Sequence, residues 1–299
     1  MVGVIARAPQ YRKLGASGIE VPALGVGTNR WRIGGPAEAA LEETFRTLVG
    51  EGACFLDTAE IYGFGKSEQM IGRCLEGLTG AGAQLVTKFA PFIARTSSRQ
   101  LLMALDASLA RLRVAQVELY LVHFPFPLAS LAEFAAGLAE AVKRGKARAV
   151  GVSNFSAEQM REMAGCLGRA GVPLAANEVH YSLLHRQPET NGVLDACREL
   201  DCALIAYFPL ASGRLARAPE AGRPDPHAEL RRQVGEIAAA RKATPAEVAL
   251  NWLLARDPRV IPIPGATKPD HVRANLAALR WQLTDAEFAA LDQAARPAS

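Results

Sequence analysis

Short, almost entirely apolar runs alternate with longer amphipathic segments along the whole chain. Runs that are apolar on both faces are typical of parallel strands, which are covered by helices on each side. The expected strands cover residues 23–27, 54–57, 85–88, 119–123, 149–152, 174–179, 203–207 and 260–263. Eight such strands, each followed by a helical pattern, favour a (β/α)8 TIM barrel.

The segments between the strands carry an apolar stripe at helical spacing, such as Leu101, Leu105, Leu109 and Leu112. The expected helices cover 38–51, 67–75, 99–112, 131–144, 157–170, 193–200, 245–256, 270–279 and 285–295. Three of them begin with the spacing of a capping box, namely Ser156 with Gln159, Thr244 with Glu247, and Thr284 with Glu287.

The 299 residues are expected to form a single barrel domain over 1–299, because barrels of about 200–250 residues or more form one domain. Residues 13–22 predict a short N-terminal β-hairpin that turns at Ser17-Gly18. Residues 208–229 predict a long loop after the seventh strand, and 284–299 an additional C-terminal helix and tail. The competing fold is an open doubly wound sheet, but its G-x-G-x-x-G fingerprint is absent from the sequence.

Charge and cysteine content narrow the class of protein. The 34 Lys and Arg against 30 Asp and Glu give a net charge of only +4, without a basic run, so we expect no nucleic-acid partner. Five cysteines without C-x-x-C spacing fit a reducing compartment. The start of the chain lacks an apolar signal core and no apolar stretch reaches about 18 residues, so we expect a cytoplasmic protein without membrane contact.

Polar residues end several of the apolar runs. Asp57, Lys88 and His123 stand at the ends of the second, third and fourth expected strands, and Tyr62 follows Asp57 by five residues in a glycine-containing loop. In a TIM barrel the carboxyl ends of the strands carry the chemistry. Further polar residues end the later strands, namely Ser153, Asn154, Glu178 and Tyr207.

These strand ends resemble those of the aldo-keto reductase family over essentially the whole chain. The matching segments are 55–63 (FLDTAEIYG), 86–88 (VTK), 119–123 (LYLVH), 151–155 (GVSNF), 205–207 (IAY) and 261–265 (IPIPG). The resemblance implies reduction of aldehydes or ketones to alcohols by hydride transfer from NADPH, with Asp57, Tyr62, Lys88 and His123 as the catalytic set and no metal.

The chemistry is consistent with those four residue types. Hydride transfer to a carbonyl creates an alkoxide that needs a proton, and a Tyr62 hydroxyl can donate it. Because an unperturbed tyrosine has a pKa near 10, a nearby ammonium on Lys88 would ease the loss of that proton. Asp57 would pair with Lys88, and His123 would orient the carbonyl oxygen.

The resemblance also implies a cofactor site. Ser153, Asn154 and Glu178 would meet the nicotinamide carboxamide and Tyr207 would stack on the ring. Lys268 beside a helix N-terminus favours the 2′-phosphate of NADPH over NADH. The remaining implied contacts are Gly27 and Thr28, the pyrophosphate loop of Leu210, Ser212 and Gly213, and the adenosine end at Gly265, Thr267, His271 and Asn275.

Three residues depart from the family pattern. Glu178 stands where glutamine is usual, Phe208 where serine is usual, and Asn29 where tryptophan is frequent. An ionised Glu178 beside the ring would favour NADP⁺ over NADPH, whereas a partner cation or protonation by burial would remove that effect.

Trp31, Phe64, Phe92 and Phe124 are the candidates for an apolar, aromatic-lined substrate pocket, and each can equally serve as packing. The spacing of His180 and His185 does not match a helical zinc pair, so we expect them to be loop or surface residues.

Two other functions stay open at this stage: a regulatory subunit of a membrane channel, and an isomerase acting on a phosphorylated sugar. The sequence does not indicate the oligomeric state.

Overall fold

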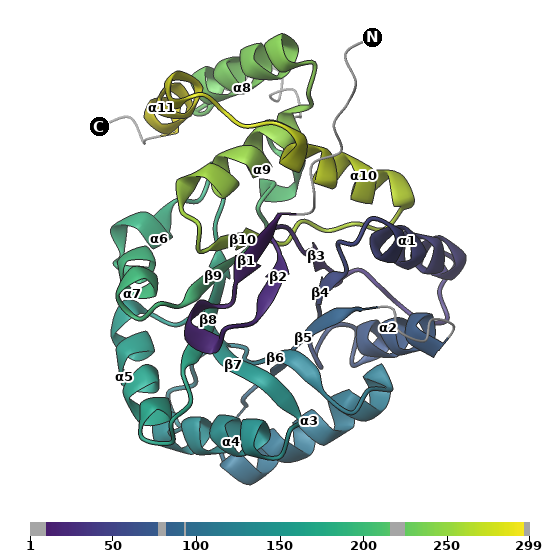
Figure 1. Cartoon of the computed structure of the whole chain (residues 1–299), viewed down its shortest axis with the longest axis vertical. Helices are drawn as coiled ribbons and strands as arrows, with labels where there is room; N and C mark the ends of the chain where they lie inside the picture. The colour runs from purple at the N-terminus through teal and green to yellow at the C-terminus, as the bar shows by residue number, and fades with distance from the viewer. Residues whose placement is uncertain (1–9, 77–81, 93, 216–224, 296–299) are drawn as a thin grey trace.

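The computed structural model describes residues 10–76, 82–92, 94–215 and 225–295, and it shows a closed ring of parallel strands surrounded by helices (Figure 1). The strands lie in chain order and neighbours pair in parallel. They are β3 (Val26–Gly27), β4 (Phe55–Asp57), β5 (Gln84–Phe89), β6 (Val117–Val122), β7 (Ala147–Ser153), β8 (Leu174–His180), β9 (Ala203–Tyr207) and β10 (Val260–Pro262). The predicted (β/α)8 barrel is confirmed.

The ring closes between the first and last strands through backbone contacts. Gly25 donates its N–H to the carbonyl of Pro262 at 3.0 Å, and Gly27 donates to Pro264 at 3.2 Å. A Cβ atom on Gly25 would lie 2.6 Å from the ring of Phe55 on β4 and 3.0 Å from the side chain of Ile263, so the packing inside the ring leaves room only for glycine at this position. The closed ring leaves its strands without an open edge.

Helices cover the outside of the ring. They are α1 (Glu38–Gly50), α2 (Lys66–Glu76), α3 (Ser98–Leu112), α4 (Leu131–Lys143), α5 (Ala157–Gly168), α6 (Gln187–Thr190), α7 (Val193–Glu199), α9 (Pro245–Arg256) and α10 (Pro269–Ala277). The three predicted capping boxes are present, and a fourth, at Ser97 and Gln100, begins α3 one residue before the predicted start. The large core lies between the helices and the outer faces of the strands.

The N-terminal hairpin covers one end of the ring. β1 (Tyr11–Lys13) pairs antiparallel with β2 (Glu20–Pro22), so the hairpin begins two residues before the predicted start. The connection is wider than a tight turn at Ser17-Gly18, because a 3₁₀ turn, η1 (Gly15–Ser17), precedes the left-handed Gly18. Leu14, Ile19 and Val21 pack with the side chains that fill the inside of the barrel. The predicted strand ends therefore meet at the opposite end of the ring.

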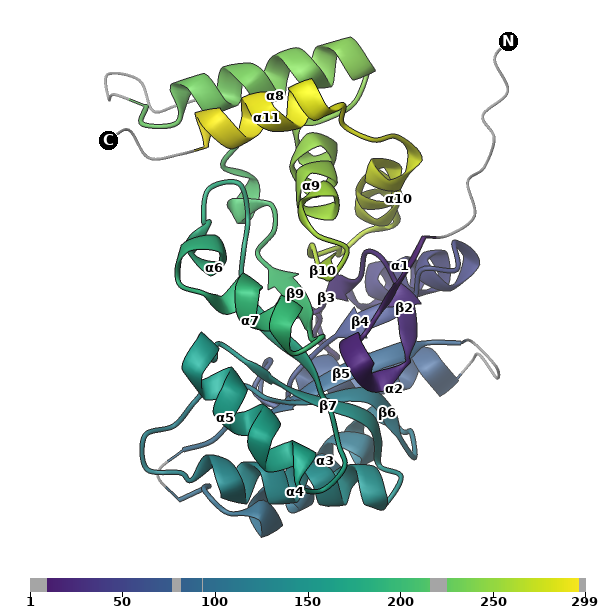
Figure 2. The same ribbon diagram turned by 60° about the vertical axis from the view of Figure 1, so that its left-hand side comes forward.

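Two helices lie outside the ring. α8 (Ala228–Arg241) and α11 (Asp285–Ala294) pack side by side against α9 (Figure 2). The predicted C-terminal helix is α11. The sequence analysis missed α8, which begins inside the predicted 208–229 loop. That loop also holds a 3₁₀ turn, η2 (Ala211–Gly213), and residues 216–224 of it lie outside the described part of the chain.

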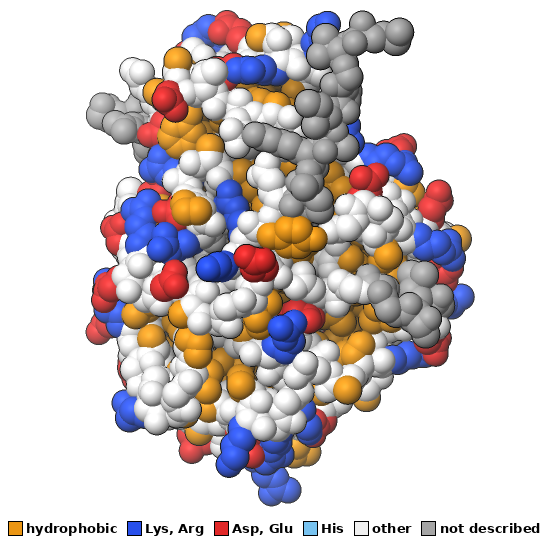
Figure 3. Space-filling view, viewed as in Figure 1, with side chains coloured by type: hydrophobic (Ala, Val, Ile, Leu, Met, Phe, Trp, Pro, Cys, Tyr) orange, Lys and Arg blue, Asp and Glu red, His pale blue; other side chains and the backbone are white. Residues whose placement is uncertain are grey.

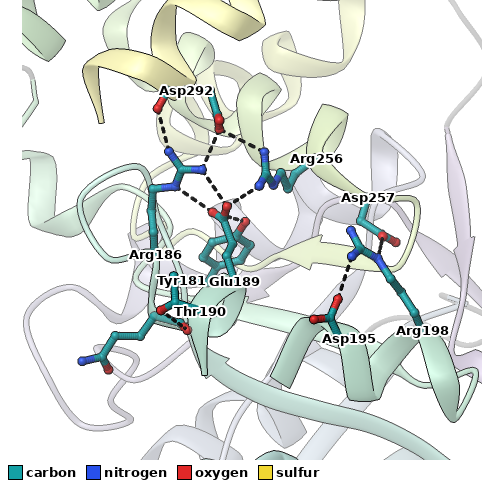
Figure 4. Close-up of polar contacts among 10 residues, drawn as sticks. Tyr181, Arg186, Glu189, Thr190, Asp195, Arg198, Arg256, Asp257 and Asp292 are labelled. Carbon is teal, nitrogen blue, oxygen red and sulfur yellow. Dashed lines mark hydrogen bonds and ion pairs between the residues drawn. The ribbon is translucent and has the colours of Figure 1, made fainter. Parts of the chain in front are cut away.

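An ion network fixes α11 to the barrel (Figure 4). Arg186, at the start of α6, bonds Glu189 (Nε–Oε1 2.7 Å) and Asp292 (Nη2–Oδ1 2.6 Å). Arg256, at the end of α9, reaches the same two carboxylates, and Tyr181 donates to Glu189 at 2.8 Å. Two cations thus balance two anions in a partly buried place, which favours a fixed arrangement.

On the face shown in Figure 3, Lys and Arg side chains are interspersed with Asp and Glu and form no single-sign patch. Within the described residues, no helix has both the length and the apolar character needed to cross a membrane.

Gly72 on α2 provides a test of the helix packing. An added Cβ would lie 2.3 Å from the backbone oxygen of Arg111, so Gly72→Ala should lower the free energy of unfolding by about 1–3 kcal/mol. Gly165 on α5 is the matched control, because a Cβ there meets nothing within 4 Å. Gly165→Ala should raise the free energy of unfolding by about 0.5–1 kcal/mol. Urea denaturation measures both, and equal effects would contradict the packing described here.

Candidate active site

The open end of the ring brings Asp57, Lys88 and His123 together. Asp57 is the last residue of β4, Lys88 is the penultimate residue of β5, and His123 directly follows β6. The parallel register aligns these strand ends, with Asp57 opposite Val86 and Lys88 opposite Leu121. The three residues that the sequence placed at neighbouring strand ends therefore lie together in the structure.

Lys88 is the buried centre of this group, with no exposure to solvent. Its Nζ donates to Asp57 Oδ1 and, at 2.9 Å, to the backbone oxygen of Thr58. Glu178 Oε2 lies 3.3 Å from the same Nζ. Burial disfavours the ammonium, but Asp57 and then Glu178 outweigh burial and raise the pKa of Lys88 above its usual value. Lys88 therefore stays charged.

Tyr62 lies over Lys88, with 5.1 Å between Nζ and the centroid of its ring. The turn that carries it contains three residues with positive φ, Gly63, Phe64 and Gly65, and Ser67 donates to the Tyr62 carbonyl as α2 begins. Burial raises the pKa of Tyr62 above its usual value, while the charge of Lys88 acts in the opposite direction. The predicted influence of Lys88 is present, but burial is the larger effect.

His123 faces Tyr62 edge-on, with 5.8 Å between the two ring centroids. Burial and then the charge of Lys88 lower the pKa of His123 to about 3, so its imidazole is neutral at physiological pH. Its Nδ1 is buried and has no hydrogen-bond partner among the described residues. A neutral imidazole can donate one hydrogen bond to a carbonyl oxygen without adding charge.

The ends of β7 and β9 form one hydrogen-bonded chain. Asn154, in a left-handed conformation (φ 61°), bonds through Nδ2 to the His123 carbonyl (3.1 Å) and to Ser153 Oγ (3.0 Å). Tyr207 donates its hydroxyl to Asn154 Oδ1 at 2.9 Å. Ser153 Oγ donates to the backbone oxygen of Glu178 at 2.9 Å. The structure thus gathers these four predicted residues at the mouth.

Glu178 points into the inside of the ring, where its side chain meets Lys88 although β8 and β5 are not neighbouring strands, and only 2% of the residue is exposed. The sequence left open that a partner cation meets Glu178, and in the structure that cation is Lys88.

A ring stack behind Tyr207 was missed by the sequence analysis. His180 stacks on Tyr207 with 5.5 Å between centroids, and His185 stacks on His180 at 3.9 Å. An antiparallel bridge between Ser182 and His185 folds the segment back and makes the contact possible. The two histidines are therefore packing partners of Tyr207, a role that their spacing of five residues did not indicate.

The predicted adenosine end lies at the start of α10. Lys268 and His271 are exposed, and Lys268 is the residue before the first turn of the helix. Thr267 donates its N–H to His271 Nδ1 at 3.3 Å. Asn275 is 5% exposed, and its Nδ2 is buried without a partner among the described residues. Gly265 forms an isolated bridge with Gly27, next to this helix. Leu210, Ser212 and Gly213 lie at η2, after β9.

Two predicted contacts require correction. Trp31 is fully buried and its indole nitrogen donates to the Ala266 carbonyl at 2.7 Å, so it is a packing residue and does not line an open pocket. Thr28 is also fully buried, and its hydroxyl bonds to the Asp57 carbonyl (2.8 Å) and to Ser67 (2.9 Å). Its side chain therefore supports β4 and has no face toward a cofactor.

The other predicted pocket aromatics lie around the mouth. Phe64 is 98% exposed and Phe92 is 48% exposed, and Phe92 packs edge-on against Phe124 at 6.1 Å. Further exposed apolar side chains on the loops after the strands are Ile61, Leu128 and Phe208, which the pocket prediction did not include. Large exposed apolar groups gathered at one place are typical of a binding surface.

Within the described residues, no group of three or more His, Cys, Asp or Glu side chains is arranged to hold a metal ion.

Comparison with known proteins identifies the family to which the chain belongs. A sequence profile of the Aldo/keto reductase family matches residues 23–296. The chain belongs to the aldo/keto reductase family. It is 32% identical to a chloroplastic pyridoxal reductase of Arabidopsis thaliana, over 96% of this chain and 86% of that protein.

Solved aldo-keto reductases have the same fold. A thermostable aldo-keto reductase in complex with the inhibitor epalrestat is 34% identical, with a TM-score of 0.83 over 95% of this chain and 99% of that one. An aldo/keto reductase from Klebsiella pneumoniae in complex with NADP and acetate is 30% identical, with a TM-score of 0.80 over 96% of both chains.

Lys88→Met tests the electrostatics of the site. The variant leaves Asp57 and Glu178 buried without a cation, and each then needs a proton that its unfolded form releases above a pH of about 4. The folded state would bind more protons than the unfolded state, so the stability of Lys88→Met should fall as the pH rises. Urea denaturation should show a deficit relative to the natural chain of about 3–5 kcal/mol at pH 7, and a smaller one at pH 5. A deficit that does not depend on pH would contradict this charge assignment.

Proposed function

We propose that the chain reduces aldehyde or ketone carbonyls to alcohols with NADPH, and that Tyr62, Lys88, Asp57 and His123 carry the reaction. The observation that supports this most directly is the buried Lys88 ammonium, which has Tyr62 on one side and two carboxylates on the other. A charge held in so dry a place without a functional reason is uncommon.

Each of the four residues has a distinct role in this proposal. Because the rings of Tyr62 and His123 pack edge-on against each other, the Tyr62 hydroxyl and a His123 ring nitrogen can both meet one carbonyl oxygen. Neutral His123 donates a hydrogen bond that orients the oxygen, and Tyr62 donates the proton that turns the alkoxide into an alcohol. Lys88 stabilises the tyrosinate that remains, and Asp57 holds Lys88 in place.

The residues at the mouth fit a nicotinamide dinucleotide, which when bound supplies the hydride. Asn275 Nδ2 is a buried donor without a described partner, close to the exposed Lys268 and His271 on α10. An exposed lysine beside a helix N-terminus suits the 2′-phosphate of NADPH. The half-buried Tyr207, backed by His180, offers a flat and fixed ring for the nicotinamide.

The exposed Phe64, Phe92 and Phe208 favour substrates with an apolar or aromatic substituent over free sugars. Their loops follow β4, β5 and β9, at the same end of the ring as Tyr62. Burial of the apolar surface of such a substrate against these side chains would stabilise the complex by about 25 cal/mol for each Å² removed from water.

Tyr62→Phe tests the proton donor. The variant keeps the ring and removes the hydroxyl, so carbonyl reduction should fall by about 10²–10⁴-fold while NADPH binding is retained. Consumption of NADPH with a panel of aromatic aldehydes, ketones and sugars measures carbonyl reduction. Cofactor fluorescence measures NADPH binding. Tyr11→Phe, an exposed tyrosine on β1, is the matched control and should leave both unchanged. Retention of most of kcat in Tyr62→Phe would refute the role of Tyr62.

Lys268→Ala tests the phosphate contact. Loss of a bond to a charged group should weaken NADPH binding by about 1–3 kcal/mol and leave NADH binding nearly unchanged. Lys143→Ala is the control, because this exposed lysine ends α4 just before the start of β7, at the end of the ring away from the mouth. Fluorescence titration with both cofactors decides the matter, and equal losses for NADPH and NADH would exclude a 2′-phosphate contact.

A further inference from the structure

Lys88 faces more negative charge than it can neutralise. Asp57 and Glu178 are 1% and 2% exposed, and both carboxylates lie against the same ammonium. His123 is neutral, and the described part of the chain places no second cation against these two carboxylates. Full ionisation would leave a net negative charge in a dry cavity, which is strongly unfavourable. The group therefore needs one additional proton.

The hydrogen bonds of Lys88 indicate which carboxyl holds that proton. An ammonium has three N–H donors, and Asp57 Oδ1 and the Thr58 carbonyl take two of them. Glu178 Oε2, at 3.3 Å, has no hydrogen-bond partner among the described residues. Asp57 is thus the carboxylate that the Lys88 hydrogen bond stabilises, and Glu178 is the carboxyl that gains most from being neutral.

Another buried carboxylate shows the contrasting case. Glu68 is also without exposure, but it accepts bonds from Arg111 Nε and Thr87 Oγ1, both at 2.6 Å. It has a cation of its own, Arg111. The excess of negative charge is therefore specific to the site that contains Glu178.

The titration behaviour agrees with this geometry. Burial, and next the charge of Asp57, raise the pKa of Glu178 well above its usual value, although Lys88 acts in the opposite direction. The other titratable groups that face it are Tyr62 and Tyr207, which are neutral at physiological pH and add no charge.

We propose that Glu178 stores a proton beside Lys88 and returns it to Lys88 during each reduction. This rests on the proposed function. When Tyr62 gives its proton to the alkoxide, its O–H bond breaks and Lys88 restores it by giving up one N–H. Glu178 then gives its O–H proton to Lys88 and becomes a carboxylate, and a proton from water restores it after the product leaves. The hydride and its electron pair come from the nicotinamide cofactor.

Glu178 is a positioning residue in this scheme, because it acts on the substrate only through Lys88 and Tyr62. While it is neutral, it leaves the third N–H of Lys88 available to Tyr62. Glutamate therefore differs in function from the usual glutamine at this position, because an amide can fill the same space but has no acidic proton to release.

Infrared spectroscopy of the whole chain tests the stored proton without any carbonyl substrate. The natural chain at pH 7 should show the stretch of a protonated carboxyl, and Glu178→Gln should abolish it. Asp57→Asn should abolish it as well, because Lys88 then faces a single carboxylate, which ionises. Glu68→Gln, buried but paired with Arg111, and the exposed Glu158→Gln are controls that should leave the band unchanged.

Each outcome bears on the proposal. Absence of the band in the natural chain, or its survival in Glu178→Gln, would overturn it. Survival of the band in Asp57→Asn would overturn the charge argument, because burial alone would then protonate Glu178. If a variant fails to fold, titration of the natural chain remains decisive, since the band must disappear in one step as the pH rises.

The pH profile of kcat tests the return of the proton. Reduction by the natural chain should fall about tenfold per pH unit above the pKa read from the infrared band, and Glu178→Gln should lack this limb. An identical limb in both proteins would refute the return step. If the natural chain shows the infrared band but reduces no carbonyl, the proposed function is refuted, whereas the protonation of Glu178 is still supported.

Discussion

The cost of burying the ammonium of Lys88 governs the arrangement of this active site. A charge without access to water needs oxygen partners on several sides, and two segments provide them: the end of β4, with Asp57 and the next residue Thr58, and β8, with Glu178. These partners reach one nitrogen only because the strands are parallel, in register and closed into a ring. The fold is thus a means of holding a charge where solvent cannot weaken it.

The opposite end of the ring meets a similar requirement with a different residue. Arg12 on β1 is largely buried and donates to the carbonyls of Leu254 and Asp257, at the end of α9, at 2.5 and 2.8 Å. Burial lowers the pKa of Arg12 to about 10, although Asp257 acts against this. Here the cation caps a helix and fixes the hairpin that covers the barrel, so it serves stability, whereas the role that we propose for Lys88 is catalytic.

The sequence predicted the ring, and it placed Asp57, Lys88 and His123 at neighbouring strand ends, because both features depend on local patterns. Each apolar run predicts a strand, and the polar residue that ends it, Asp57, Lys88 or His123, is thereby placed at the carboxyl end of that strand. The predicted features that failed depend on contacts distant in sequence. Trp31 was predicted to line the pocket. Its burial depends on the Ala266 carbonyl, which is 235 residues away along the chain and which no local pattern around Trp31 indicates. α8 was missed because few of its side chains are apolar and buried, with Leu230 and Val234 among them.

Glu178 shows the same limit within the site. Its place near the end of β8 was visible in the sequence, but the contact of its side chain with Lys88 across the inside of the barrel follows from the shape of the closed ring. Likewise, the stack of His185, His180 and Tyr207 depends on a chain reversal at Ser182 that no periodic pattern specifies.

The network around Arg186 links the end of the chain to the mouth. Asp292 on α11 holds Arg186, and Arg186 directly follows His185, which stacks on His180 behind Tyr207. The path from the C-terminal helix to the ring expected beneath the nicotinamide therefore passes through the side chains of Arg186, His185 and His180 and one peptide bond. A premature stop codon or a bulky C-terminal fusion that displaces α11 would loosen the floor of the cofactor site, although it changes no residue of the barrel itself.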